Sequence, residues 1–335
     1  MKIIVDAYGG DHAPLEILKG AVDAHGEYGH DILLTGKEAE LRTLAAEQGL
    51  SLEGIAIADA PDVISMNDIP RTILKEHKEC SMAVGLRLLA AGEGDAFVSA
   101  GSTGALIMGA TFLVKRIKGI TRPALAAVVP SAKTPFLLVD SGANVDCRPE
   151  MLMQFARMGS IYMTEVMQQG RAATVGLLNV GTEEHKGGEL QHETYALLNN
   201  SDLNFIGNVE ARDVPAGVAD VVVTDGFGGN VLLKSMEGTV DMLMGFLKGI
   251  LYATPLTKLG ALTMKSRFGG LKKKLSTAEY GGAPLLGVSR PVIKVHGNSK
   301  AYAVKNAIRV AANFAAADVI GKIAARVSAD AKGDE

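Results

Sequence analysis

The sequence contains no tryptophan, and aromatic residues make up only 5% of it. Base-stacking surfaces are built from aromatic side chains, and a formal net charge of -3 gives no overall attraction for a polyanion. We therefore expect no nucleic-acid partner. The two cysteines, Cys80 and Cys147, are too few for a disulfide framework. A reducing, cytoplasmic compartment fits this composition.

Long apolar runs are also missing. No stretch of about 18 uncharged apolar residues occurs, so the sequence predicts no membrane-spanning helix. The chain opens directly on an apolar strand pattern at residues 3–5, without the charged and apolar regions of a secretory signal. We expect a cytoplasmic protein.

Several enzyme signatures are absent. Residues 226–228 read Gly-Phe-Gly and begin a dinucleotide-binding fingerprint, but Val231 stands where the third glycine is required. No P-loop occurs, and no serine has the flanking glycines of a nucleophile elbow. His185 and His192 lack the spacing of zinc ligands. We predict no metal and no cofactor, and leave open whether a divalent ion assists anion binding.

The chain does contain short apolar strand patterns, each followed by a glycine-rich polar loop. Residues 221–223 are three valines, residues 224–230 read Thr-Asp-Gly-Phe-Gly-Gly-Asn, and an apolar helix pattern then begins. Any one such loop can be a tight turn, because Gly, Asn and Asp tolerate positive φ. Open α/β sheets, however, bind ligands at the carboxyl ends of their strands. Six of these junctions therefore predict one shared cleft; the other five loops are 6–11, 99–104, 140–144, 179–187 and 296–300.

Strand and helix patterns alternate from residue 2 to about residue 235, which predicts a mainly parallel sheet covered on both faces, a three-layer α/β/α sandwich. The length of 335 residues and hydrophobic content of 47% suit one large domain over residues 1–330 with a frayed tail at 331–335. Expected helices lie near 13–25, 37–48, 71–92, 103–115, 149–169, 188–199, 229–250 and 299–327.

One segment departs from this alternation of strand and helix patterns. Between Met242 and Ala278 there are seven basic residues and no acidic one, amid many apolar residues. Pro255 divides the segment, so we predict an inserted basic amphipathic helical hairpin at about 240–278. Such a hairpin suits a membrane surface or an acidic partner, and equally a dimer-interface or core helix with solvated lysines. Amphipathicity alone does not separate these interpretations.

The loops offer backbone donors, hydroxyls, amides and few charges, an inventory that suits an oxyanion such as phosphate. Ser102, Thr103 and the backbone of Gly104 can form a cradle of N–H and hydroxyl groups at a helix start. Lys186 can supply a point charge.

Taken together, six runs resemble the bacterial phosphate acyltransferase family, the acyl-ACP:phosphate transacylases of phospholipid synthesis. The resemblance spans nearly the whole chain in the right order, with Tyr8 where the family commonly has Met. It implies transfer of a fatty acyl group from acyl-ACP to inorganic phosphate, giving acyl phosphate. The matching residues are 6–11, 99–105, 140–144, 179–184, 224–230 and 296–299.

The resemblance also implies a fold similar to those of phosphate acetyltransferases and the isocitrate/isopropylmalate dehydrogenases. It implies a homodimer that is peripherally associated with the membrane surface. There the acyl phosphate passes to a membrane glycerol-3-phosphate acyltransferase. Two alternatives are a CoA-dependent phosphate acetyl- or butyryltransferase and a lipid-surface scaffold with an inactive cleft.

Phosphate needs positioning rather than activation, because it is already an anionic nucleophile. We predict that Ser102, Thr103 and the Gly104 backbone bind it. Asn179 and Asn230 would orient the phosphate or donate to the oxyanion that develops on the thioester. A helix cap or turn is the structural alternative for Asn230.

The remaining candidates carry charge. Lys186 would offset the phosphate charge or donate to the thioester oxygen, and Asp225 would orient Lys186 or accept a phosphate proton. His296 would protonate the leaving thiolate, a role that His185 can also fill. Asp225 can instead be a helix N-cap, and His296 a core histidine. Cys147 as an acyl-enzyme nucleophile is a minor alternative.

Overall fold

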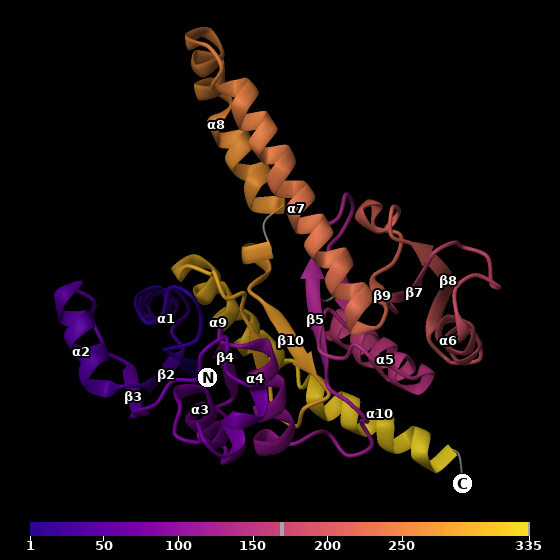
Figure 1. The fold of residues 1–335 in the computed structure, drawn as a ribbon, viewed down its shortest axis with the longest axis horizontal. Helices are drawn as coiled ribbons and strands as arrows, with labels where there is room; N and C mark the ends of the chain where they lie inside the picture. Colours follow the sequence, from indigo (N-terminus) through magenta and orange to yellow (C-terminus); the bar gives the residue numbers. More distant parts are fainter. Residues whose placement is uncertain (168–170, 276, 334–335) are drawn as a thin grey trace.

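The computed structural model describes residues 1–167, 171–275 and 277–333. Its strands form one 11-stranded sheet in the order β3-β2-β1-β4-β11-β10-β5-β6-β9-β7-β8. The expected α/β class is confirmed (Figure 1). The strands are β1 (Lys2–Asp6), β2 (Asp31–Gly36), β3 (Ile55–Asp59), β4 (Ala96–Ser99), β5 (Ala124–Val129), β6 (Phe136–Val139), β7 (Thr174–Asn179), β8 (Asn204–Glu210), β9 (Val221–Val223), β10 (Ala283–Leu286) and β11 (Val292–Lys294).

Helices cover both faces of the sheet. Alternate residues of a strand point to opposite faces, so Val98 joins one apolar cluster and Phe97 another. The α-helices are α1 (Leu15–Tyr28), α2 (Glu38–Glu47), α3 (Ser81–Ala90), α4 (Thr103–Gly109), α5 (Pro149–Glu165), α6 (Glu189–Asn199), α7 (Gly226–Leu251), α8 (Pro255–Leu275), α9 (Ala301–Ala316) and α10 (Val319–Gly333). Shorter turns are η1 (Pro70–Leu74), the π-helix η2 (Ala110–Val114), η3 (Val214–Ala216) and η4 (Thr277–Tyr280).

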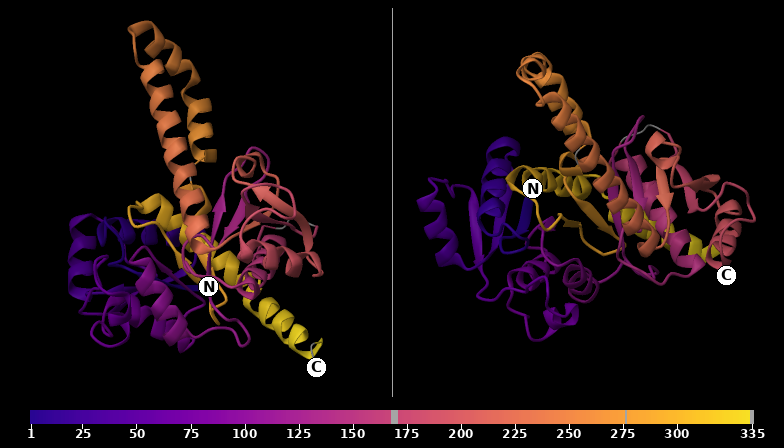
Figure 2. Two further views of the ribbon diagram at one scale, coloured as in Figure 1. Left: turned by 45° about the vertical axis from the view of Figure 1, so that its right-hand side comes forward. Right: turned by 45° about the horizontal axis from the view of Figure 1, so that its top comes forward.

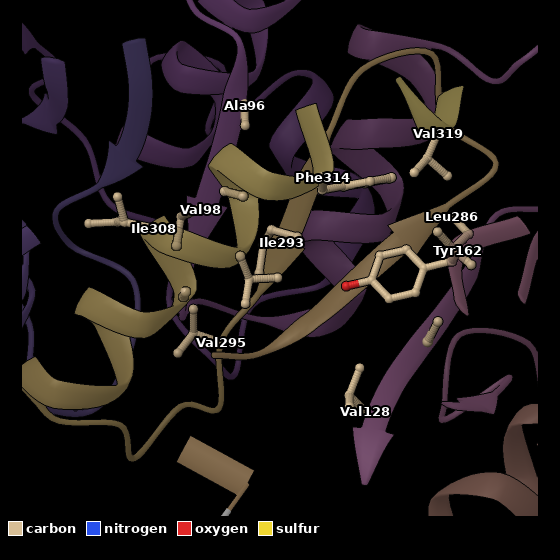
Figure 3. Packing of buried hydrophobic residues seen from close by; sticks show 14 of the residues in the cluster. Ala96, Val98, Val128, Tyr162, Leu286, Ile293, Val295, Ile308, Phe314 and Val319 are labelled. Carbon is tan, nitrogen blue, oxygen red and sulfur yellow. The ribbon is translucent and has the colours of Figure 1, made fainter. Parts of the chain in front are cut away.

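The main core lies between the sheet and the layer of α1, α5, α9 and α10. Figure 3 shows Ile308 and Phe314 of α9 among strand residues such as Val98 and Ile293. Phe314 meets Tyr162 of α5 edge to face, with ring centroids 5.7 Å apart. α3 and α4 pack on the opposite face, and Leu232 of α7 does so further along the sheet.

The sheet reverses direction near its middle. β1, β4 and β11 run parallel to one another, and so do β6, β9 and β7. Between the two sets, β10 is antiparallel to both β11 and β5, and β5 is antiparallel to β6. The carboxyl ends of the two sets therefore point in opposite directions, and they lie along the two opposite margins of the sheet that are formed by strand ends.

This reversal corrects the expectation that all six loops share one edge of a parallel sheet. Loops 6–11, 99–104 and 296–300 form a first loop group at one edge. Loops 140–144, 179–187 and 224–230 form a second loop group at the other. Some of the strands that lead into these loops are short: β9 and β11 have only three residues each. The distance along the strands between the two loop groups is therefore small.

α7 and α8 form a two-helix arm that stands away from the sheet (Figures 1 and 2). α7 begins inside the body at Gly226, and α8 begins at Pro255. Beyond the body the arm exposes large apolar side chains, among them Phe246, Ile250, Leu259 and Leu262. None of the helices in the described part of the chain has the length and apolarity needed to cross a lipid bilayer.

The C-terminal segment differs from the prediction in two respects. The helix expected over 299–327 is two helices, α9 and α10, because the chain turns at Asp318, which has a φ of 47°. α10 continues to Gly333, although the sequence predicts a frayed tail from residue 331. The last two residues of that tail, 334–335, lie outside the described residues, as do 168–169 at the end of the helix expected over 149–169.

Candidate active site

The first loop group is built around the buried carboxylate of Asp6, at the end of β1. Ser81 and Ser99 donate their hydroxyls to its two oxygens, each at 2.6 Å. Burial raises the pKa of Asp6, while these hydrogen bonds act in the opposite direction. Gly9 lies so close that a Cβ there would come within 2.6 Å of the Gly101 nitrogen. Loops 6–11 and 99–104 are therefore locked together.

Ser102 is the N-cap of α4, and its hydroxyl accepts the Ala105 N–H at 3.5 Å. Thr103 and Gly104 are the first residues of that helix, and Gly104 lies against the ring of Pro70. The three predicted phosphate ligands thus share one helix start at the edge of the sheet. The π-helix η2 directly continues α4.

Basic groups gather beside this helix start. β4 and β11 are parallel neighbours with Lys294 opposite Ser99, so their loops leave the sheet side by side. Lys294 is only 7% exposed, and burial lowers the pKa of its ammonium to about 8. It donates to the carbonyl oxygens of Ala100, at 3.4 Å, and Val295.

His296 follows this strand and meets α7. Lys234 Nζ lies 2.9 Å from His296 Nε2 and 2.5 Å from Glu237 Oε2. The pKa of His296 is lowered, first by burial and then by the positive charge of Lys234. The imidazole is therefore neutral near pH 7 and able to accept a proton.

The second loop group holds the start of α7. The Asp140 carboxylate accepts the Asn144 N–H at 2.7 Å and the Asn144 side-chain amide at 2.8 Å. The Asn144 carbonyl in turn accepts the Gly226 N–H at 2.7 Å. Only glycine fits at position 229, because a Cβ there would collide with the carbonyl oxygen of Asp140. The first turn of α7 is thus fixed against loop 140–144.

Asp225 and Asn230 belong to this helix start. Asp225 is the N-cap of α7 and accepts the Gly228 N–H at 2.7 Å, so its cap role is observed. The Asn230 amide lies beside Gly142, 3.3 Å from where a Cβ on that glycine would stand. Residues four apart share one face of a helix, so Asn230 and Lys234 are neighbours. α7 thereby connects the two loop groups.

Loop 179–187 is closed by its own amide side chain. Asn179 donates to the Lys186 carbonyl oxygen at 2.9 Å, and its own side-chain oxygen accepts the Val180 N–H at 2.8 Å. Lys186 is half-buried in that loop. Among the hydrogen bonds and ion pairs of residues 1–167, 171–275 and 277–333, none joins Lys186 to Asp225. The expected orienting contact between them is not formed in this structure.

The two minor candidates lie elsewhere. His185 is exposed, and its carbonyl oxygen is 2.9 Å from a ring nitrogen of His192. Cys147 is half-buried, its thiol is 3.4 Å from the Asn144 carbonyl oxygen, and burial raises its pKa to about 12. A thiol with that pKa is protonated near pH 7, which argues against a nucleophilic role.

The fatty acid synthesis protein family matches residues 1–322 of the chain. The phosphate acyltransferase of Thermoanaerobacterium thermosaccharolyticum is 46% identical over 323 residues, 96% of this chain and 96% of that protein. The chain belongs to the phosphate acyltransferase family. The phosphate acyltransferase of Caldanaerobacter subterraneus subsp. tengcongensis is 47% identical over 339 residues, 100% of this chain and 99% of that protein. The family resemblance found in the sequence is confirmed, and the chain is an acyltransferase enzyme.

Solved structures outside the phosphate acyltransferases share the fold. EutD phosphotransacetylase from Staphylococcus aureus superposes with a TM-score of 0.61 at 17% identity, over 94% of each chain. A branched-chain phosphotransacylase from Enterococcus faecalis V583 gives 0.59 at 15% identity, over 94% of this chain and 99% of that one. At these identities the likeness concerns the fold, and it confirms the predicted similarity to phosphate acetyltransferases.

Residues that the sequence did not single out complete the site. Lys294 is a lysine within an apolar strand pattern, which is an unusual place for a charge. Lys234 lies four positions after Asn230, so helical spacing alone places the two together. Asp6 and Asp140 each end a strand pattern and begin a recognised loop. Their burial, which makes them structural anchors, has no counterpart in the sequence.

Proposed function

We propose that the protein transfers a fatty acyl group from acyl-ACP to inorganic phosphate and releases acyl phosphate for phospholipid synthesis. The observation that carries this proposal is the contact of Lys234 with His296 at 2.9 Å, next to the buried ammonium of Lys294. Basic groups of this kind suit a small dianion. Phosphate is the anion in the name of the relatives.

Phosphate would bind at the first loop group. Ser102, Thr103 and the Gly104 backbone supply hydroxyl and N–H donors at the start of α4. Lys294 ends the neighbouring strand and Lys234 lies beside His296, so the anion would have donors on one side and positive charge on the other. Such a site positions the phosphate oxygen for attack without a covalent enzyme intermediate.

His296 would move the proton of the reaction. The lowered pKa of its imidazole keeps the ring unprotonated and so available to take a proton from the phosphate monoanion, which leaves the more nucleophilic dianion. A phosphate oxygen then forms a bond to the thioester carbonyl carbon, and the carbon–sulfur bond breaks. The imidazolium returns its proton to the departing thiolate. His296 thus acts first as a base and then as the acid predicted from the sequence.

The thioester oxygen would be stabilised from α7 and loop 179–187. Asn230 carries an amide on the helix face that leads to Lys234, and it would donate to the developing oxyanion. Lys186 would offset the phosphate charge, with Asn179 holding the loop that carries it. Asp225 would position α7 as its N-cap. Lys186→Ala should raise the KM for phosphate, and an unchanged phosphate dependence would remove Lys186 from the site.

The two-helix arm would bring the enzyme to the membrane surface. Its exposed apolar residues, and the seven basic residues in a sequence stretch, 242–278, that has no acidic one, support contact with an anionic bilayer. There a homodimer would pass acyl phosphate to a membrane glycerol-3-phosphate acyltransferase. The proposed location is cytoplasmic and peripheral to the membrane. Sedimentation velocity tests the homodimer, and a purely monomeric protein would contradict it.

The decisive experiment supplies the protein with acyl-ACP and inorganic phosphate. Acyl phosphate is trapped with hydroxylamine as the hydroxamate and quantified by mass spectrometry. We expect phosphate-dependent product with acyl-ACP and much less with the matching acyl-CoA. The reverse preference would favour a CoA-dependent phosphate acyltransferase, and no product with either donor would refute the proposal.

A further inference from the structure

A basic cavity lies at the edge of the sheet opposite the Lys234–His296 pair. Its volume is about 860 Å³, within the range of roughly 300–1,000 Å³ found for small-molecule sites. It opens beside the second loop group, because its wall continues directly from loop 140–144. One carboxylate, Asp146, and five cations line it: Lys115, Arg116, Lys118, Arg122 and Arg148.

None of these five cations takes part in an ion pair within the part of the chain that the structure describes. Only Arg116 has a side-chain hydrogen bond, to the carbonyl oxygens of Ile120, at 3.3 Å, and Thr121. Several cations elsewhere on the surface are paired, as Lys305 is with Glu27 and Lys322 with Glu165. Like charges gathered around a concave surface repel one another and raise its affinity for an anion.

The rim of the cavity is held in a fixed shape. Lys115 follows the π-helix η2 and has a φ of 76°, a conformation that non-glycine residues rarely adopt. Its carbonyl accepts the Ser289 N–H at 2.9 Å. Gln154 of α5 binds the backbone of Gly119 and Thr121 at 3.0 and 2.9 Å. π-Helices and strained backbone gather at functional sites, and a preformed rim loses little entropy on binding.

Part of the cavity lining is apolar, and this apolar part is called the floor below. Ile117, Ile120 and Met151 are buried there, while Phe112 is 59% exposed at its side. A lining that combines five cations with buried apolar side chains matches a ligand with an anionic head and an apolar chain. An acidic protein surface would use the charges but not the floor, because a protein partner needs a broad contact of about 800 Å².

We propose that the basic cavity binds a phosphoryl group carried at the end of an apolar chain. Arg122 and Arg148 present guanidinium groups that can each donate two hydrogen bonds to a phosphoryl group. The acyl phosphate of the proposed reaction belongs to this chemical class, and only that identification rests on the proposed function. The binding itself is independent of which donor the enzyme uses.

Dodecyl phosphate is the probe, and binding to the full-length protein is measured by isothermal titration calorimetry below the micellar concentration. The cavity variant combines Lys118→Gln, Arg122→Gln and Arg148→Gln, whose side chains make no hydrogen bond or ion pair in the described structure. We expect its affinity for dodecyl phosphate to fall by about tenfold or more, since each charge-assisted hydrogen bond contributes about that factor.

The matched control removes three cations outside the cavity, Lys75→Gln, Lys78→Gln and Lys133→Gln, and should bind as the parent does. Butyl phosphate and inorganic phosphate should bind the parent more weakly than dodecyl phosphate, because they leave the floor uncovered. Equal affinity for dodecyl phosphate in parent and cavity variant would overturn the proposal. So would a cavity variant that loses affinity for acidic ACP but keeps dodecyl phosphate, since that result would make the cavity a protein-docking surface.

The hydroxamate assay separates this inference from the proposed function. A parent protein that binds dodecyl phosphate through the cavity but forms no acyl phosphate would refute the proposed function and leave the cavity assignment standing. Acyl phosphate formation with no difference between the cavity variant and the parent in dodecyl phosphate affinity would do the opposite.

Discussion

The Lys234 ammonium lies 2.9 Å from Nε2 of His296 and helps to lower the pKa of that imidazole. Replacing Lys234 by Met removes a positive charge, so protonation of His296 becomes easier and its pKa should rise. NMR titration of the His296 ring protons measures this shift directly. The acid limb of the pH–rate profile should move to higher pH in step, and the KM for phosphate should increase by about tenfold.

Lys248→Met is the matched control, because Lys248 lies on the same helix but out in the exposed arm. It should leave both the titration and the phosphate dependence unchanged. An unshifted His296 titration in the Lys234 variant would show that Lys234 does not act on the imidazole.

Lys294 predicts a pH dependence of stability. Burial lowers its pKa from 10.5 to about 8, so the folded protein releases this proton at lower pH than the unfolded chain. Between these values the unfolded state binds more protons, and stability therefore rises with pH. Relative to Lys294→Met, the parent should gain up to about 3 kcal/mol of unfolding free energy from pH 8 to 10.5. Urea unfolding of both proteins across that range measures it; a constant difference would contradict the prediction.

Cys147 separates direct attack by phosphate from an acyl-enzyme route. Its pKa is raised to about 12, so the thiolate population at neutral pH is very small. Cys147→Ser should keep acyl phosphate formation within about twofold of the parent, because serine preserves the size and the polar contact. Loss of nearly all activity, with an unchanged melting temperature, would establish the covalent route instead.

For single residues of the site, the sequence predicts which residues are polar and functional better than it predicts what each of them contacts. Ser102 and Asp225 are visible as polar residues before apolar helix patterns, and both are N-caps in the structure. The pairing of Lys234 with His296 spans 62 positions. No local pattern reports such a contact, because it depends on how α7 lies across the sheet.

Among the elements, the two-helix arm is where apolar exposure is concentrated. Replacing Phe246, Ile250, Leu259 and Leu262 by Ser removes side chains that are 62–67% exposed and carry no core packing. Flotation with anionic liposomes should be lost, because the apolar area that enters the bilayer is gone. Acyl phosphate formation in the absence of liposomes should be retained.

Val180→Ser, Ile206→Ser and Val218→Ser provide the control for the arm, since these exposed apolar residues lie outside it. They should leave flotation intact. Should the arm variant still float while its oligomeric state changes, the arm would be a subunit interface rather than a membrane contact.

Elements bounded by strong local signals were predictable. Pro255 marks the start of α8, and the valines at 221–223 form β9. The sequence does not predict the division between α9 and α10, because alanine-rich sequence on either side of Asp318 continues the helical pattern. Only the left-handed backbone at Asp318 ends the first helix, and an aspartate is a weak sign of that conformation.

For the whole molecule, the alternation of strands and helices predicts the sandwich but not the direction of its strands. β5 and β10 are short, buried and apolar, like the parallel strands around them. A strand that is buried on both faces has the same apolar pattern whether it runs parallel or antiparallel to its neighbours. The sequence therefore does not predict the reversal of the sheet or the separation of the loops into two groups. α7 restores the connection, since it starts in one group and contacts the other.

This connection can be tested by a mutation in the second loop group whose effect is measured at His296 in the first loop group. Gly229→Ala places a methyl group against the Asp140 carbonyl oxygen and must displace the first turn of α7. Lys234, little more than one turn later, should then move away from His296. We expect a higher His296 pKa in the NMR titration and a higher KM for phosphate, along with a lower melting temperature.

Gly238→Ala is the matched control on the same helix, because a Cβ there meets nothing within 4 Å. It should stabilise α7 by up to about 1 kcal/mol, as alanine does relative to glycine within a helix, and leave His296 unchanged. If Gly229→Ala lowers stability without moving the His296 titration, the two loop groups act separately. The acyl transfer site would then have to be confined to one edge of the sheet.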